Sequence, residues 1–223
     1  MKTNRVTPLR RPRAILFDWD NTLVDNWTVI HTALNTALTA MGHAPWTFAE
    51  TKQRVRASAR DSFPKLFGDR WEEAQEIFYD AFRKAHLEQL REMPGAGAML
   101  GELADAGVYL GVVSNKQGPF LRKEAEYLGW TRHFGRIVGA TDAPRDKPAV
   151  EPVDMALEGS GVARGPDVWF VGDTDIDLLC AVNSGCVPIL LRKEPPAPDE
   201  FPAAPPARHV EECRALAMLV ADI

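Results

Sequence analysis

Cysteine is scarce in this sequence: 223 residues contain only Cys180, Cys186 and Cys213. No two of them are spaced as CxxC, and an odd number leaves one without a partner. A small domain held together by disulfides is therefore excluded, and reduced thiols in a cytosol are expected. The five histidines show no paired spacing, so the sequence predicts no zinc site.

The sequence also lacks an apolar run long enough to cross a bilayer. Residues 28–49 carry no charge, but polar and apolar residues alternate there at the spacing of an amphipathic helix. Residues 1–13 contain five Lys or Arg, yet the apolar run that follows, 14–17, is too short for a signal peptide. We expect a disordered basic lead-in on a cytoplasmic protein with no membrane partner.

A dense basic patch is absent as well. The chain has 26 Lys+Arg against 31 Asp+Glu, a net charge of -5, whereas a general nucleic-acid binder needs clustered cations to displace counterions from phosphates. A composition of 45% hydrophobic and 26% charged residues is typical of a globular protein. A small molecule is the expected partner, and the oligomeric state is left open.

Short apolar runs alternate with helical patterns over most of the chain. The runs that predict strands are 14–17, 108–113, 168–171, 187–191 and, more weakly, 136–139. Helical patterns lie between them at 98–106, 119–128, 153–159 and 176–184. This alternation predicts an α/β fold with a Rossmann-like parallel sheet core and helices on both faces.

One region departs from the alternation. From Asn26 to Met93 the sequence shows helical periodicity and no strand-like run. We therefore expect an all-helical cap over residues 26–93, inserted into an α/β catalytic core formed by residues 1–25 and 94–223, with Pro94-Gly95 as a hinge. Residues 193–208 hold six of the 17 prolines and predict an extended strap before a last helix at 211–220.

Polar residues follow the predicted strands, and in a parallel α/β sheet ligands bind outside the carboxyl ends of the strands. These residues are Asp18 and Asp20, Ser114 and Asn115, Asp173 and Asp177, and Lys147 in a loop. Several carboxylates at one edge repel unless a cation lies among them, and hard oxygen donors suit Mg²⁺. A carboxylate nucleophile, a second carboxylate, a hydroxyl, an ammonium and Mg²⁺ together describe phosphoryl transfer through an aspartyl-phosphate.

Four motifs in this order resemble the haloacid dehalogenase-like phosphatases, and among them the phosphoglycolate-phosphatase-like members with a helical cap after the first strand. The motifs are DWDNT at 18–22, VVSN at 112–115, DKP at 146–148 and VGDTDID at 171–177. The resemblance covers about residues 14–191. It implies a Mg²⁺-dependent phosphomonoester hydrolase that acts on a small phosphorylated metabolite.

The resemblance also implies a role for each matching residue. Asp18 is expected to be the nucleophile and Asp20 the general acid/base. Ser114 is expected to bind the transferring phosphoryl group, with the amide of Asn115 beside it. Lys147 is expected to hold the nucleophile and the phosphate oxygens.

For the metal, the resemblance implies that Asp173 binds Mg²⁺ together with Asp18 and the backbone carbonyl of Asp20. Asp177 matches the second acid of the last motif. It is expected to hold the metal ligands in place without contacting the metal itself. Asp175 fills a position that varies in the family and receives no metal role.

Other interpretations stay open. Taken singly, Asp18 and Asp20 also fit turn residues at a strand end, and Asp173 a helix N-cap. A phosphomutase would keep every motif, whereas a catalytically silent phosphate-binding module would be expected to lose Asp18 or Asp20. Dehalogenase chemistry would need neither Asp20 nor the ligand Asp173.

Three further cations are predicted to be solvated. Lys116 follows Asn115 and is expected to be an exposed loop lysine. Arg56 and Arg60 share a predicted helix face in the insert, where contact with an anionic substrate is the less favoured interpretation.

Overall fold

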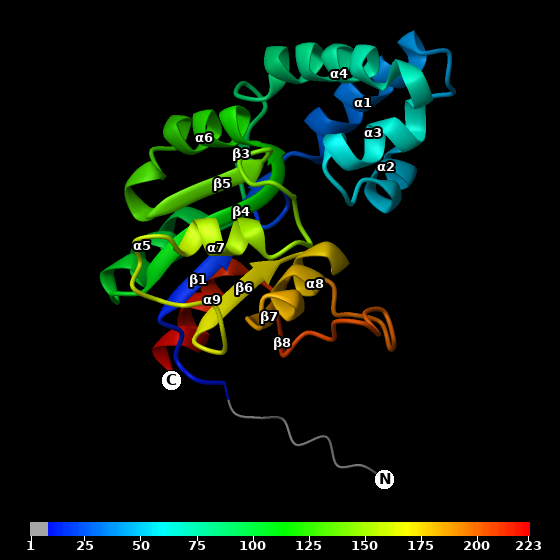
Figure 1. Ribbon diagram of the computed structural model, residues 1–223. Coiled ribbons are helices and arrows are strands. Elements are labelled where there is room, and N and C mark those ends of the chain that lie inside the picture. The colour runs from blue at the N-terminus through cyan, green and yellow to red at the C-terminus, as the bar shows by residue number, and fades with distance from the viewer. Residues whose placement is uncertain (1–8) are drawn as a thin grey trace.

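The structure, a computed structural model, describes residues 9–223 (Figure 1). Six parallel strands form one sheet in the order β5-β4-β1-β6-β7-β8. The strands are β1 (Ala14–Phe17), β4 (Tyr109–Gln117), β5 (Arg136–Ala140), β6 (Val168–Gly172), β7 (Val187–Leu191) and β8 (Arg208–Val210). The predicted α/β class is confirmed.

Helices cover both faces of this sheet. They are α5 (Ala96–Asp105), α6 (Gly118–Tyr127), α7 (Glu151–Leu157), α8 (Asp175–Asn183) and α9 (Cys213–Ala221). Ile15 and Phe17 point into an apolar cluster with α5, α6 and α9, while Leu16 points into a second cluster with α7 and α8. Because β1 is buried on both faces, all four of its residues are apolar.

The segment after β1 is helical and lies beyond one end of the sheet, above it in Figure 1. It contains α1 (Trp27–Ala40), α2 (Phe48–Arg54), α3 (Ala59–Phe67), a 3₁₀ turn (Gly68–Arg70) and α4 (Trp71–Ala85). Its own apolar cluster includes Leu34, Leu38 and Phe63. An inserted helical cap therefore has a small core separate from that of the sheet.

Two short strands join this cap to the sheet. β2 (Val24–Asp25) and β3 (Arg91–Glu92) pair antiparallel, so the two connections leave the core side by side. The expectation of no strand in residues 26–93 is thus wrong at Arg91–Glu92. Strands of two residues are too short to show the alternating pattern by which a strand is recognised in a sequence.

Other differences lie at strand ends and in the strap. β4 continues to Gln117, four residues past the predicted end, because Gln117 pairs with Ala140 of β5 after a register shift. β8 was not predicted, since a three-residue strand at the sheet edge carries little apolar pattern. Residues 193–207 contain no helix or strand, as expected, and Phe201 anchors them against Leu178.

The basic lead-in is described only in part. Residues 1–8 lie outside the described residues. In the rest, the Arg13 amide donates to the Asp167 carbonyl at 2.8 Å and Leu9 packs against the core, so the disorder expected there is not observed. The cysteines are buried and unpaired. None of the helices in residues 9–223 has both the length and the apolar character needed to cross a membrane.

Candidate active site

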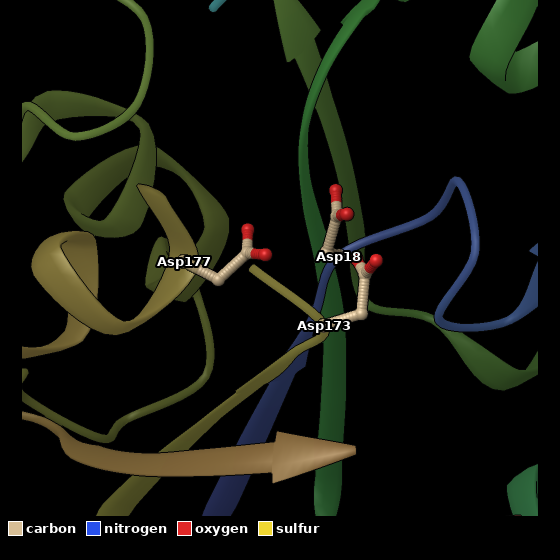
Figure 2. Close-up of side chains that lie close together, drawn as sticks. All are labelled: Asp18, Asp173 and Asp177. Carbon is tan, nitrogen blue, oxygen red and sulfur yellow. The ribbon is translucent and has the colours of Figure 1, made fainter. Parts of the chain in front are cut away.

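Three carboxylates meet at the carboxyl edge of the sheet. Asp18 follows β1, Asp173 follows the neighbouring strand β6, and Asp177 lies in the first turn of α8. One carboxylate oxygen from each lies within 4.8 Å of the others. Figure 2 shows their carboxylates turned toward one another. The convergence follows from the pairing of Phe17 with Val171, which brings the two strand ends together.

Lys147 lies among these carboxylates. Its Nζ is 2.6 Å from Asp18 Oδ1 and 2.7 Å from Asp177 Oδ1, and the side chain is buried. Burial disfavours the ammonium, but Asp177 and Asp18 together raise the pKa of Lys147 above its ordinary value. Lys147 is therefore a fixed positive charge beside Asp18.

Asn115 holds the backbone of Lys147. The Lys147 amide donates to Asn115 Oδ1 at 3.0 Å, and Asn115 Nδ2 donates to the Lys147 carbonyl at 3.3 Å. Two hydrogen bonds from one amide fix the loop against the end of β4. The side chain expected to lie beside the substrate is thus engaged with the loop that carries Lys147.

Both carboxylate oxygens of Asp177 already accept hydrogen bonds. Its Oδ1 accepts from Lys147, and its Oδ2 accepts from the Thr174 amide at 3.0 Å and the Thr174 hydroxyl at 2.9 Å. This arrangement caps the first turn of α8. A Cβ at Gly172 would lie 2.3 Å from Asp177 Cβ, so this close approach requires glycine.

The site has an excess of negative charge. Burial raises the pKa of Asp18 to about 7, with Lys147 opposing the rise and Asp177 adding to it. Desolvation also raises the pKa of Asp173 well above its ordinary value, and Asp177 and Asp18 add to that rise. Three carboxylates face one ammonium, which leaves two uncompensated charges. The oxygens of Asp18 and Asp173 fit a hard divalent cation such as Mg²⁺.

Asp20 points away from this group toward a second set of polar side chains. Its Oδ1 accepts from Lys116 Nζ at 2.6 Å and from Asn26 Nδ2 at 2.8 Å. Its Oδ2 accepts no hydrogen bond from residues 9–223, and the side chain is partly exposed to the cavity. One oxygen of Asp20 is thus fixed, and the side chain lines the cavity.

Glu124 of α6 is the centre of this second set. It is fully buried and accepts from Lys116 Nζ at 2.7 Å, Trp19 Nε1 at 2.7 Å and His86 Nδ1 at 2.9 Å. Burial alone would raise the pKa of Glu124, but Lys116 and the hydrogen bonds from His86 hold it below its ordinary value. A buried carboxylate therefore holds the lysine that fixes Asp20.

The prediction that Lys116 is an exposed loop lysine is wrong. The residue lies within β4 with its side chain 5% exposed, between Asp20 and Glu124. Glu124, Asn26 and His86 were not predicted. Asn26 lies 98 positions from Glu124 in the sequence, and His86 lies 38 positions from it. No local spacing could therefore reveal these contacts.

Of the two cap arginines predicted to be solvated on one helix face, Arg60 differs from the prediction, whereas Arg56 is exposed as expected but lies between α2 and α3 and not on a helix. Arg60 of α3 contacts Asp146 of the core through Nη2 at 2.6 Å and Nε at 3.1 Å. Arg56 lies 3.8 Å from Asp175, and both side chains are well exposed. Each pair crosses from the cap to the core, so the cap is closed over the edge of the sheet.

One cavity joins the predicted residues. It is lined by Asp18, Asp20, Ser114, Asn115, Lys147 and Asp173 from the core, and by side chains of the cap. Ser114 is nearly buried, and its hydroxyl accepts from the Lys116 amide at 3.2 Å. Asp177 lies behind this lining. The arrangement offers a carboxylate nucleophile, a nearby carboxylate acid, a hydroxyl, an ammonium and a cation site facing one space.

Known proteins resemble this chain in sequence. The sequence pattern of the haloacid dehalogenase-like hydrolases matches residues 15–190. A phosphoglycolate phosphatase from Aquifex aeolicus is 30% identical over 177 residues, covering 78% of this chain and 81% of the relative. A second phosphoglycolate phosphatase, from Photorhabdus laumondii, is 28% identical over 186 residues, covering 80% of this chain and 79% of the relative.

A solved structure has the same fold. The haloacid dehalogenase-like family hydrolase from Streptococcus pneumoniae superposes with a TM-score of 0.80 at 20% identity, covering 96% of this chain and 99% of the other. The matched segment runs from β1 to β7 and thus includes every motif residue of the cavity. The chain belongs to the haloacid dehalogenase-like hydrolase family.

Proposed function

We propose that this chain is a Mg²⁺-dependent phosphomonoester hydrolase that works through an aspartyl-phosphate on Asp18. The observation that carries the proposal is the position of Asp18, between the ammonium of Lys147 and the carboxylate of Asp173 at the floor of a cavity. The names of the relatives, which are phosphatases, support the same reaction class.

In the first step Asp18 attacks phosphorus. Lys147 engages Oδ1, whereas Oδ2 accepts no hydrogen bond from residues 9–223 and is the oxygen that can react. The Oδ2–P bond forms, the P–O ester bond breaks, and its electron pair leaves with the alcohol oxygen. That oxygen takes a proton from Asp20, whose side chain lines the same cavity.

In the second step Asp20 accepts a proton from water. The water oxygen attacks phosphorus, the Oδ2–P bond breaks, and Asp18 is regenerated with release of phosphate. Lys116 and Asn26 hold Asp20 in one orientation through both steps. The hydroxyl of Ser114 and the ammonium of Lys147 would hold the phosphoryl oxygens.

The oxygen donors of the site fit Mg²⁺. Asp18 and Asp173 would hold the ion together with the backbone carbonyl of Asp20, and Asp177 would hold Lys147 rather than the ion. When bound, Mg²⁺ would neutralise charge on the phosphoryl group as Asp18 approaches it. We place the cap at residues 26–93, with the core at 1–25 and 94–223, and assign to the cap the exclusion of bulk water.

The two alternatives that the sequence left open, a phosphomutase and a catalytically silent phosphate-binding module, are less well supported. A phosphomutase needs cap groups that hold a second phosphoryl group, and both arginines that line the cavity from the cap are paired with carboxylates. A catalytically silent phosphate-binding module would not need the hydrogen bonds from Lys116 and Asn26 that orient Asp20 for proton transfer. The cytoplasmic location stays a prediction.

The test is phosphate release from p-nitrophenyl phosphate. We expect turnover with Mg²⁺, none in excess chelator, and none in Asp18→Asn, which keeps the shape of the side chain and removes its nucleophilic charge. Full activity in chelator, or in Asp18→Asn, would contradict the proposal.

A further inference from the structure

The cavity extends from Asp18 deep into the cap, and its far part is apolar. Its cavity volume is about 170 Å³. Apolar side chains from three cap helices and from α6 line the far part: Ile30, Phe63, Leu66, Phe78, Phe82 and Phe120. Three of these, Ile30, Leu66 and Phe78, are only partly buried and leave apolar surface for an occupant.

The rings are already ordered by contacts with one another. Phe78 packs edge-on against Phe63 at 5.5 Å and lies stacked with Phe82 at 5.9 Å. Phe120 of the core packs edge-on against Phe82 at 5.3 Å. The apolar wall therefore spans cap and core, and it is formed when the cap is closed.

The cations that line the cavity already have carboxylate partners. Among residues 9–223, four cations line it: Arg54, Arg56, Lys116 and Lys147. Each pairs with a carboxylate: Glu50 with Arg54, Asp175 with Arg56, Glu124 with Lys116 and Asp18 with Lys147. The remaining polar groups from the cap include the neutral Ser62 and Tyr79; burial raises the pKa of Tyr79 to about 12. A carboxylate on the leaving group would therefore have to displace Glu50 or Asp175 to pair with a cap arginine, and elsewhere in the cap it would enter an apolar space.

We infer that the substrate is the phosphate ester of an uncharged, apolar alcohol whose body fills the space between Ile30, Leu66 and Phe78. The inference rests on the proposed function and adds the class of leaving group. It separates this chain from an enzyme for a small ester whose leaving group carries a carboxylate, such as phosphoglycolate, the compound in the names of its relatives. Binding would come from apolar burial in the cap, and chemistry from the edge of the sheet.

The test is a series of n-alkyl phosphates with Mg²⁺, in which the leaving groups have similar acidity and differ in length. We expect kcat/KM to rise from ethyl through butyl to hexyl phosphate by up to about fourfold for each buried methylene. Phosphoglycolate should be hydrolysed no faster than ethyl phosphate. A flat series, or a preference for phosphoglycolate that disappears in Arg56→Ala, would overturn the inference while leaving the hydrolase intact.

A matched pair of variants ties the effect to the cavity. Ile30→Asn should reduce the ratio of hexyl to ethyl phosphate hydrolysis by at least about fourfold, because the new amide makes part of the wall polar. Ile77→Asn changes the same side chain on α4, where Ile77 is partly buried outside the cavity, and should keep that ratio. Equal hexyl-to-ethyl hydrolysis ratios in Ile30→Asn and Ile77→Asn would also overturn this inference. If no ester is hydrolysed at all, the proposed function fails and this inference fails with it.

Discussion

Arg60 of the cap and Asp146 of the core form a two-point ion pair that links the cap to the loop of Lys147. The two guanidinium nitrogens contact the two carboxylate oxygens at 2.6 and 3.1 Å. The Asp146 side chain is almost completely buried, and its Oδ1 also accepts from the Thr141 amide at 2.9 Å. Asp146 directly precedes Lys147, so closure of the cap and the position of the Lys147 ammonium share one contact.

Arg60→Ala should therefore loosen the closed cap. We expect the free energy of unfolding to fall by about 1–2 kcal/mol, since the pair is charged but Arg60 is partly exposed. KM for an alkyl phosphate should rise more than kcat falls. Arg60→Lys should recover only part of the loss, because an ammonium cannot donate in the same two-point geometry.

Arg70→Ala is the control for this variant. Arg70 also lies in the cap and pairs with Glu73, but both side chains are more than half exposed and the pair does not reach the core. Its removal should leave KM unchanged. Identical KM values for Arg60→Ala and the wild type would show that the contact with Asp146 has no part in substrate binding.

The raised pKa of Asp18 predicts how pH affects the stability of the metal-free protein. A pKa of about 7 in the folded state, against an ordinary 3.8, means that the folded protein holds an extra proton between these values. Stability is therefore greatest below the ordinary value and decreases as pH rises toward about 7. Without Mg²⁺, the melting temperature of Asp18→Asn should fall less over this range than that of the wild type.

Mg²⁺ should remove this penalty. The ion stabilises the deprotonated carboxylates, so we expect it to raise the melting temperature more at about pH 7.5 than at about pH 5. Calorimetry with and without Mg²⁺ measures both effects. If the ion raised the melting temperature of Asp18→Asn and Asp173→Asn as much as that of the wild type, its site would lie elsewhere.

Asp18 and Asp20 should be separable by their kinetics. Asp20→Asn should lower turnover of alkyl phosphates by about 10²–10⁴-fold, because the alcohol then leaves without a proton. With p-nitrophenyl phosphate, whose phenolate leaves unaided, the same variant should release a burst of nearly one equivalent before hydrolysis of the intermediate stalls. Asp18→Asn should show no burst and no covalent phosphoryl group, and rapid-quench labelling would detect either.

Lys116 should affect both stability and proton transfer. Lys116→Met leaves Glu124 buried without its cation, which should cost about 3–5 kcal/mol of unfolding free energy. Adding Glu124→Gln should recover part of this loss. Turnover of alkyl phosphates should fall more than that of p-nitrophenyl phosphate, since Asp20 loses its orientation. Lys123→Met, an exposed change on helix α6 beside Glu124, should alter none of these quantities.

Gly172 should tolerate no side chain. In Gly172→Ala the new Cβ would meet Asp177 Cβ at 2.3 Å, and displacement of Asp177 would also move Lys147. We expect a loss of about 1–3 kcal/mol together with reduced activity. Gly101→Ala is the matched control: no atom lies closer than 4.0 Å to its new Cβ, and alanine in helix α5 should stabilise the protein by about 0.5–1 kcal/mol. Full activity of Gly172→Ala would show that Asp177 can shift without effect.

The sequence by itself determined the sheet, the helical insert and the motif residues at the sheet edge. A strand buried on both faces is apolar along its length, and its polar end is visible next to it, as at Phe17 and Asp18. Since parallel strands end at one edge, the motifs place Asp18 and Asp173 at the same edge of the sheet, and the pairing of β1 with β6 brings them together.

Only the tertiary structure decided which residues support that edge. Lys116 lies 96 positions from Asp20, and Arg60 lies 86 from Asp146, and nothing within a helix or strand indicates either partner. The apolar cavity likewise depends on the angle at which α1, α3 and α4 meet α6, which brings side chains of separate helices to one surface. Local pattern specifies which residues are buried or lie at strand ends; the closing of the cap specifies which of them touch.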